Sequence, residues 1–187
     1  PSVAEGGSIL YTVSLDNPAG TPVSVTLSNG ATISIAAGAS SGSVSIAAPT
    51  DDVYVDAGSV SATISTASGG NFESLAIDPA AATTSITDTL DATTVSISGD
   101  GSVNEGASAS YTVSLTSPAQ SAVTVNLAYG GTAADGSDFS GILSVTIPAG
   151  ASSASFSLAT IDDAIVEGAE SFSVSIGSAS GGNFENL

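Results

Sequence analysis

Residues 9–15 read Ile9-Leu10-Tyr11-Thr12-Val13-Ser14-Leu15, and the last five letters return unchanged as Tyr111-Thr112-Val113-Ser114-Leu115. In this stretch apolar Tyr, Val and Leu alternate with polar Thr and Ser. A period of two is typical of a β-strand that turns one face to a core and the other to water. Its exact return indicates that the strand belongs to a unit that occurs twice.

The repetition extends to both sides of this strand. Ser2-Val3-Ala4-Glu5-Gly6 returns as Ser102-Val103-Asn104-Glu105-Gly106, and residues 68–73 return as 180–185. The offset grows from 100 to 112 along the chain, so the second copy carries an insertion of about a dozen residues, around 130–141. We therefore expect two tandem domains, residues 1–91 and 92–187.

Both copies consist of short alternating runs bounded by Gly, Pro, Asn and Asp. Asn29-Gly30 separates two such runs, which is a strong hairpin signal. No segment shows a helical period. The pattern predicts an all-β fold of two antiparallel β-sandwiches. The expected strands are 9–15, 23–27, 32–35, 43–46, 83–87, 93–98, 110–115, 123–127, 143–147, 155–158 and 171–176.

The chain starts and stops out of register with the repeat. The first copy has no counterpart of strand 93–98, and the second stops before a counterpart of strand 83–87. We expect the first domain to be short of its first strand and the second of its last. The chain is then an excerpt of a longer array, or neighbouring identical chains supply the strands end to end.

Composition excludes several classes of function. The chain has 18 Asp plus Glu, no Lys, Arg, His or Cys, and a net charge of −18. Without basic residues it offers nothing to phosphate, so we expect no nucleic-acid partner and no attraction to anionic membranes. It has no apolar run of about 18 residues, so no membrane insertion is expected in this segment. Its 42% hydrophobic content argues against disorder.

An enzyme is the least favoured class. Ser and Thr are abundant, but no His or Lys could act as their base. Paired carboxylates could hydrolyse glycosides, yet the chain has few aromatics and no Trp to form a sugar platform. We therefore expect no enzymatic activity.

The acidic residues of the second copy are expected in loops or at strand ends. Alternate loops gather at one end of a sandwich, so these carboxylates can converge. No basic side chain can neutralise them, and Ca²⁺ accepts six to eight oxygen ligands in flexible geometry. Magnesium fits less well, and zinc lacks His and Cys ligands. The residues in question are Glu105, Asp135, Asp138, Asp162, Asp163, Glu167 and Glu170.

Four motifs of the second copy, in this order and spacing, resemble the Calx-β domain. They are Val103-Asn104-Glu105-Gly106, the stretch 131–139 (GTAADGSDF), Ile147-Pro148-Ala149-Gly150 and the stretch 162–172 (DDAIVEGAESF). The resemblance implies an immunoglobulin-like sandwich that binds calcium at one pole. It implies ligand roles for Glu105, Asp138, Asp162, Asp163, Glu167 and Glu170, and for the backbone carbonyl of Ile165. The family's last ligands follow the final strand, beyond the end of this copy.

The first copy resembles this family less closely. It lacks the 131–139 loop, which the Asn29-Gly30 turn replaces, and a counterpart of Glu170. We expect fewer or weaker ions there, with Asp88 and Asp91 at the junction of the two copies. Its candidate ligands are Glu5, Asp51, Asp52, Asp56, Asp88 and Asp91.

Tandem sandwiches without Lys, Arg or Cys are also similar to the extender repeats of large RTX-type bacterial surface adhesins. This similarity implies an extracellular location at the bacterial cell surface, where calcium stiffens a stalk that holds a binding tip away from the cell. The expected partners are neighbouring repeats or identical chains end to end. One alternative is a subunit of an extracellular filament assembled by strand exchange. A calcium sensor is less favoured, because such proteins normally contain Lys and Arg.

Overall fold

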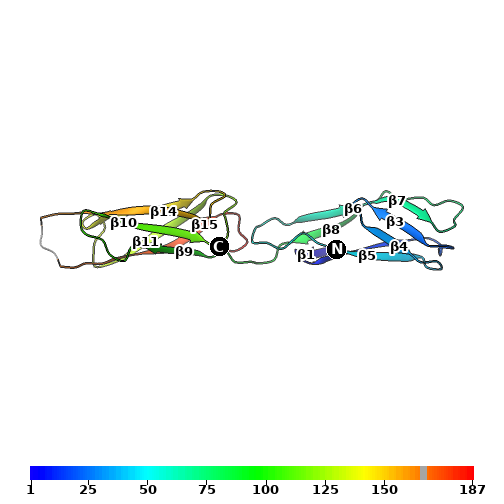
Figure 1. Cartoon of the computed structure of the whole chain (residues 1–187), viewed down its shortest axis with the longest axis horizontal. Helices are drawn as coiled ribbons and strands as arrows, with labels where there is room; N and C mark the ends of the chain where they lie inside the picture. Colours follow the sequence, from blue (N-terminus) through cyan, green and yellow to red (C-terminus); the bar gives the residue numbers. More distant parts are fainter. Residues whose placement is uncertain (165–167) are drawn as a thin grey trace. The chain divides into compact units, whose positions relative to one another are not determined.

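The computed structural model describes residues 1–164 and 168–187, and every helix or strand among them is a β-strand (Figure 1). This confirms the all-β prediction. The chain divides into two compact units. Unit 1 comprises Pro1–Asp52 and Asp56–Thr89, and unit 2 comprises Val53–Val55 and Leu90–Leu187. Each unit is an immunoglobulin-like sandwich of mainly antiparallel strands.

Unit 1 contains three short sheets, in the orders β2-β5, β4-β3-β7 and β1-β8-β6. Only Thr63 separates β6 from β7, so the chain passes directly from the sheet that contains β6 to the sheet that contains β7. The pairing of β1 with β8 is parallel, whereas the sequence predicted antiparallel neighbours only. The strands are β1 (Ser2–Ala4), β2 (Ser8–Ser14), β3 (Val23–Leu27), β4 (Thr32–Ile35), β5 (Ser41–Ala47), β6 (Gly58–Ala62), β7 (Ile64–Gly69) and β8 (Ala82–Thr87).

Unit 2 contains two sheets, in the orders β12-β14-β10-β9 and β13-β11-β15. The insertion found in the sequence lengthens β11 and adds the two-residue strand β12. A bulge between Asn126 and Leu127 shifts the register of β11 against β15. The strands are β9 (Val95–Gly99), β10 (Ser108–Leu115), β11 (Val123–Gly131), β12 (Phe139–Ser140), β13 (Ser144–Ile147), β14 (Ser153–Thr160) and β15 (Phe172–Gly181).

Alternation decides which side chains form each core. On β2, Ile9 and Tyr11 are buried while their neighbours Leu10 and Thr12 are exposed. On β11, Val123 and Val125 are buried in the same way. Burial of Val- or Ile-sized side chains stabilises a fold by roughly 1.5–3 kcal/mol each, and each unit has its own cluster of them.

The glycine pair after the last shared strand makes the same turn in both units. Gly70 and Gly182 both have φ of +84°, and a Cβ atom at either would lie 2.2 or 2.3 Å from the ring of the Phe two residues later. Only glycine therefore lets Phe72 and Phe184 fold back onto their cores.

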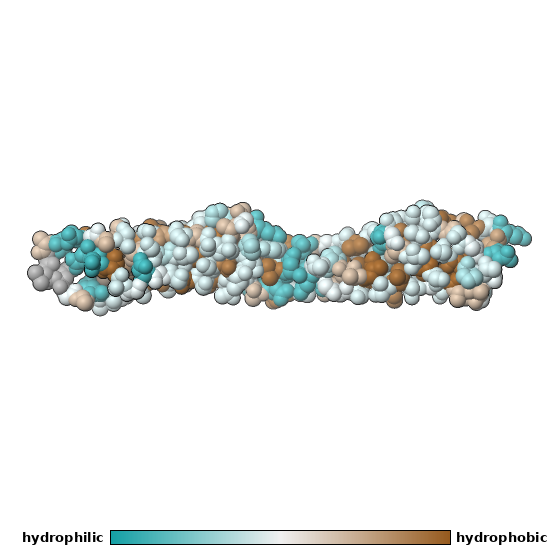
Figure 2. Space-filling model, viewed as in Figure 1, coloured by the Kyte–Doolittle hydropathy of each residue, from teal (hydrophilic) through white to brown (hydrophobic). Residues whose placement is uncertain are grey.

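Besides β1 and β12, the two units differ in an edge strand. β8 of unit 1 has no counterpart among the described strands of unit 2. Conversely, β9 pairs with β10 in unit 2, but the edge of the equivalent strand β2 has no such partner among the described strands of unit 1. The exposed strand faces carry Ser and Thr, and Figure 2 shows such faces in pale colours, with strongly hydrophilic residues in separate teal groups.

No helix among the described residues is long and apolar enough to cross a bilayer.

Candidate metal centres

In unit 1, three carboxylates meet at one end of the sandwich. Oxygen atoms of Glu5, Asp52 and Asp56 lie within 4.8 Å of one another. Glu5 directly follows β1, and its N–H donates to the carbonyl of Thr87, the last residue of β8, at 3.1 Å. Gly6, with φ of +66°, turns the chain so that its own N–H reaches the carbonyl of Pro49 at 2.7 Å. These backbone bonds hold Glu5 against the loop between β5 and β6 that carries both aspartates.

Glu5 is buried, at 7% exposure, and its Oε2 atom has no hydrogen-bond partner. Its pKa is raised from 4.5 to about 7. The largest cause is the hydrogen bond with Asp56, followed by burial and then by the negative charges of Asp56, Asp88 and Asp52. A buried carboxylate normally finds a positive partner, and this chain has no basic side chain to supply one.

The other candidates of the first copy lie near this cluster or apart from it. A carboxylate oxygen of Asp88 lies within 4.8 Å of one of Glu5, and Asp88 Oδ1 is buried without a hydrogen-bond partner. Asp51 accepts a 2.5 Å hydrogen bond from the hydroxyl of Thr89. Asp91 belongs to unit 2, where its N–H donates to Glu185 at 2.6 Å. Within unit 1, the structure therefore gathers Glu5, Asp52, Asp56 and Asp88.

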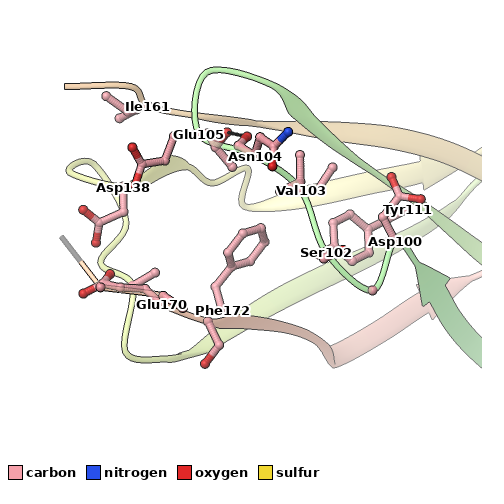
Figure 3. A pocket seen from close by; sticks show the side chains of 17 residues that line it. Asp100, Ser102, Val103, Asn104, Glu105, Tyr111, Asp138, Ile161, Glu170 and Phe172 are labelled. Atoms are coloured by element: carbon pink, nitrogen blue, oxygen red, sulfur yellow. Dashed lines mark hydrogen bonds between the residues drawn. The ribbon is translucent and has the colours of Figure 1, made fainter. Parts of the chain in front are cut away.

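In unit 2, the acidic residues of three loops line one end of a pocket of about 640 Å³. Glu105, Asp138 and Glu170 lie at its outer end, and Asp100 lies at the other (Figure 3). The loop before Asp138 is closed by two bonds with Ala134: the N–H of Ala134 donates to Asp138 Oδ2 at 2.6 Å, and the N–H of Asp138 donates to the Ala134 carbonyl at 2.9 Å.

Electrostatic crowding is also present at this end of unit 2. The pKa of Glu170 is raised, chiefly because neighbouring protein atoms remove water from its carboxyl, although the residue as a whole is exposed. The charge of Asp138, a hydrogen bond to it and the charge of Glu105 add to the shift. Among the described residues of unit 2, however, no three acidic groups come within 4.8 Å of one another.

Of the remaining candidates of the second copy, four follow β14 in the sequence and Asp135 precedes β12. Asp162 and Asp163 are exposed, and a Cβ atom on Gly106 would lie 3.2 Å from that of Asp162, which places Asp162 beside the turn after Glu105. Ile165 and Glu167 lie outside the described residues. Asp135 holds its own loop, because its Oδ1 accepts the N–H of Gly141 at 2.7 Å.

Reasoning from sequence missed the apolar interior of this pocket. Ala109, Tyr111 and Phe172 line it behind the carboxylates, and burial raises the pKa of Tyr111 together with the charges of Asp100 and Tyr129. No local pattern announces the pocket, because its lining comes from stretches that are distant in sequence.

The donor sets fit a hard divalent cation. Every candidate side chain is a carboxylate, which suits Ca²⁺ with its six to eight oxygen ligands, and no His or Cys is available for zinc. In unit 1, the buried Oε2 of Glu5 is the atom that such an ion would satisfy.

Comparison with solved structures finds weak similarity. Two crystal structures of calcium-binding domains, CBD12 of CALX1.2 and CBD12 of CALX1.1, align with TM-scores of 0.39 and 0.38 at 19% identity, over 95% of this chain and 77% of each of theirs. A likeness this weak says nothing about what this chain binds. None of the curated proteins compared matches it.

Comparison with protein families gives a clear result. The LapA domain matches residues 1–89 and again residues 91–187, so the two matches cover nearly the whole chain. This domain is adhesin-related, which indicates a role at the cell surface. The chain belongs to the LapA domain family and contains the domain twice.

Proposed function

We propose that these two LapA domains are calcium-rigidified extender repeats of a secreted bacterial cell-surface adhesin, which space its binding tip from the cell. In unit 1 the proposed ligands are Glu5, Asp52, Asp56 and Asp88, with Asp51 beside them. In unit 2 the proposed ligands are Glu105, Asp138, Asp162, Asp163, Glu167, Glu170 and the carbonyl of Ile165. Asp91 is a further proposed ligand.

The observation that carries this proposal is the state of Glu5. A buried carboxylate with an unpartnered oxygen stands within 4.8 Å of two more carboxylates, in a chain without a basic side chain. Like charges at such distances repel strongly unless one is protonated or a cation joins them. Calcium would remove the repulsion and satisfy Glu5 Oε2.

The same ion would stiffen unit 1. Glu5 follows β1, Asp88 follows β8, and Asp52 and Asp56 lie in the loop between β5 and β6. Joining their carboxylates through one ion ties three separate stretches of the chain together at one end of the sandwich. Because an ion that binds only the folded state adds its binding free energy to folding, calcium would raise stability and rigidity together.

The test is a thermal melt of the whole chain in calcium and in chelator, with small-angle scattering under both conditions. At a calcium concentration about 100 times the dissociation constant, the stabilisation of unit 1 is about 2.7 kcal/mol, which for a domain of this size is a rise in its Tm of roughly 10–20 °C. The scattering should show a less flexible particle in calcium.

Two variants make the test specific to the site. In the Glu5→Gln variant, most of the calcium-dependent rise in the Tm of unit 1 should disappear. Glu73→Gln removes the same charge from an exposed residue outside the cluster, and this variant should show the full calcium-dependent rise in Tm. Equal Tm in calcium and chelator would rule out the calcium mechanism, and an equal loss in both variants would assign the effect to net charge alone.

A further inference from the structure

A short segment of the first repeat belongs to the compact unit of the second. Val53–Val55 are part of unit 2, and two of these residues, Val53 and Tyr54, pack against its hydrophobic core. We call Val53–Val55 the docked segment. In sequence it lies between Asp52 and Asp56, so two of the proposed calcium ligands stand directly before and directly after it.

The backbone of the docked segment pairs with the turn that follows β15. The N–H of Val55 donates to the carbonyl of Asn183 at 3.0 Å, and the side-chain amide of Asn183 donates to the carbonyl of Val55 at 3.2 Å. In the other direction, the N–H of Glu185 donates to the carbonyl of Val53 at 3.0 Å. These bonds form one antiparallel bridge and give the segment a defined conformation.

The side chain of Tyr54 adds the contacts that are specific to its residue type. Its ring stacks on the ring of Phe184, with the centroids 5.5 Å apart and the planes at 24°. Its hydroxyl donates to the carbonyl of Pro118 at 2.5 Å. The ring contact and the hydroxyl bond together fix both the position and the rotation of this side chain. Tyr54 is therefore the residue that anchors the docked segment.

The surface that receives the segment is ordered by bonds in which the segment takes no part. The side-chain amide of Asn183 donates to Gln120 Oε1 at 2.7 Å, and the N–H of Gln120 donates to the carbonyl of Gly182 at 3.0 Å. Asn183 has φ of +61°, a left-handed conformation in which Asn is favoured over most other residues. The groups that bond to the docked segment are thus held in place from within unit 2.

The docked segment can open without unfolding either core. It has three residues, four hydrogen bonds and one aromatic contact, and both flanking aspartates are exposed. Small contacts that are bordered by exposed chain open at low free energy. The segment therefore has a docked and an open state.

We propose that docking of this segment tightens the cation site that Asp52 and Asp56 form with Glu5, and that Tyr54 is its positioning residue. An ion that binds the open loop must also order the residues between the two aspartates, which costs conformational entropy. An ion that binds the docked loop meets residues that are already ordered. This inference rests on the proposed calcium function and adds a residue that regulates it.

Thermodynamic linkage makes the effect reciprocal. The factor by which docking strengthens calcium binding equals the factor by which calcium strengthens docking. Calcium should therefore slow the exchange of the amides that hold the docked segment. A tyrosine that served only the packing of unit 2 would leave docking and calcium binding independent of each other.

The experiment measures both quantities on the whole chain by NMR. Hydrogen exchange of the Val55 and Glu185 amides reports docking, because both donate across the bridge. A calcium titration followed at the Glu5 and Asp56 amides reports the cation site. Tyr54→Ala should speed the exchange at least tenfold in chelator and weaken calcium binding at least tenfold. In the unaltered chain, calcium should slow the same exchange about tenfold.

Two further variants separate positioning from folding. Tyr54→Phe keeps the ring contact and loses only the hydroxyl bond, so both quantities should lie between those of Tyr54→Ala and the unaltered chain. Val55→Ala alters a side chain of the same segment that is 51% exposed, and both quantities should stay within about twofold of the unaltered chain. Protected amides in β11 confirm that unit 2 remains folded in each variant.

The possible failures are distinct. If Tyr54→Ala speeds the exchange but leaves the calcium affinity unchanged, or does not speed the exchange at all, the positioning role is overturned and the calcium function stands. If calcium changes neither Glu5 nor Asp56 signals even in the unaltered chain, the calcium function is overturned, and the effect of docking on the cation site is overturned with it.

Discussion

Glu5 and Glu105 occupy equivalent positions in the two repeats, and a glycine follows each of them. Glu5 is nevertheless buried, at 7% exposure, whereas Glu105 is exposed to solvent. The end of β8 accounts for the difference. In unit 1 its last carbonyl accepts the N–H of Glu5, and the described part of unit 2 has no equivalent strand. A local sequence motif thus identifies a candidate ligand. Whether the carboxylate of that ligand is buried depends on a strand about 80 residues away in sequence.

The largest test of this comparison removes the inward side chain of β8. Ile86→Asp places a charge in the core of unit 1 and should cost about 3–5 kcal/mol of its unfolding free energy, because the buried charge has no partner. It should also expose Glu5 and return the pKa of Glu5 toward its ordinary value.

Urea denaturation followed by the amide signals of unit 1 measures the loss. Ser85→Asp, on the exposed face of the same strand, is the matched control and should stay within about 1 kcal/mol of the unaltered chain. A comparable loss in both variants would show that charge on β8, rather than burial of Ile86, is responsible.

A second test addresses a feature that the units share. Gly70→Ala and Gly182→Ala both put a Cβ atom against an aromatic ring at a φ of +84°, so each should destabilise its own unit by about 2–4 kcal/mol. Gly30→Ala has a similar φ of +85° but open space around the new methyl group, and should cost only about 1 kcal/mol. Thermal denaturation resolved by unit checks all three, and a large difference between the first two would break the equivalence of the turns.

The smallest expected effect is a change in the stability of unit 1 with pH when no metal is bound. The pKa of Glu5 is raised from 4.5 to about 7 in the folded state, so folding favours its protonated form. The stability that this provides is complete below pH 4.5 and is lost as the pH rises through about 7. In chelator, unit 1 should therefore be less stable at pH 8 than at pH 5.

Glu5→Gln should flatten this slope, and Glu105→Gln, at the exposed equivalent position, should leave it unchanged. Urea denaturation at the two pH values provides the comparison. A slope that survives Glu5→Gln would place the titrating group elsewhere.

Alternation predicted most of the strands. The predicted strands 23–27 and 32–35 coincide with β3 and β4, and the hairpin turn at Asn29-Gly30 joins them as expected. β1, β6, β7 and β12 were missed. β1 has three residues and β12 has two, which is too short for any period to be visible, and β6 is mostly Gly, Ser and Ala with a single Val.

The candidate sites were less accessible from sequence. The acidic residues could be named, because a chain without basic residues draws attention to each of them. Which of them converge depends on tertiary pairing: Glu5, Asp52 and Asp56 meet, while Asp51 bonds to Thr89. The parallel pairing of β1 with β8 carries no sequence signal of its own, and it is this pairing that closes over Glu5.

That parallel pair also has a mechanical consequence. The first strand of unit 1 and its last strand lie side by side and run in the same direction, with Ser2 opposite Ser85 and Ala4 opposite Thr87. A pull that draws Ser2 and Thr87 apart along the chain therefore acts parallel to both strands. It loads bonds such as Ser85 N–H to the Pro1 carbonyl and Glu5 N–H to the Thr87 carbonyl simultaneously rather than one after another. The geometry of unit 1 therefore resists tension by loading this strand pair in shear. An ion bound by Glu5 and Asp88 would add a further cross-link at the end of the pair.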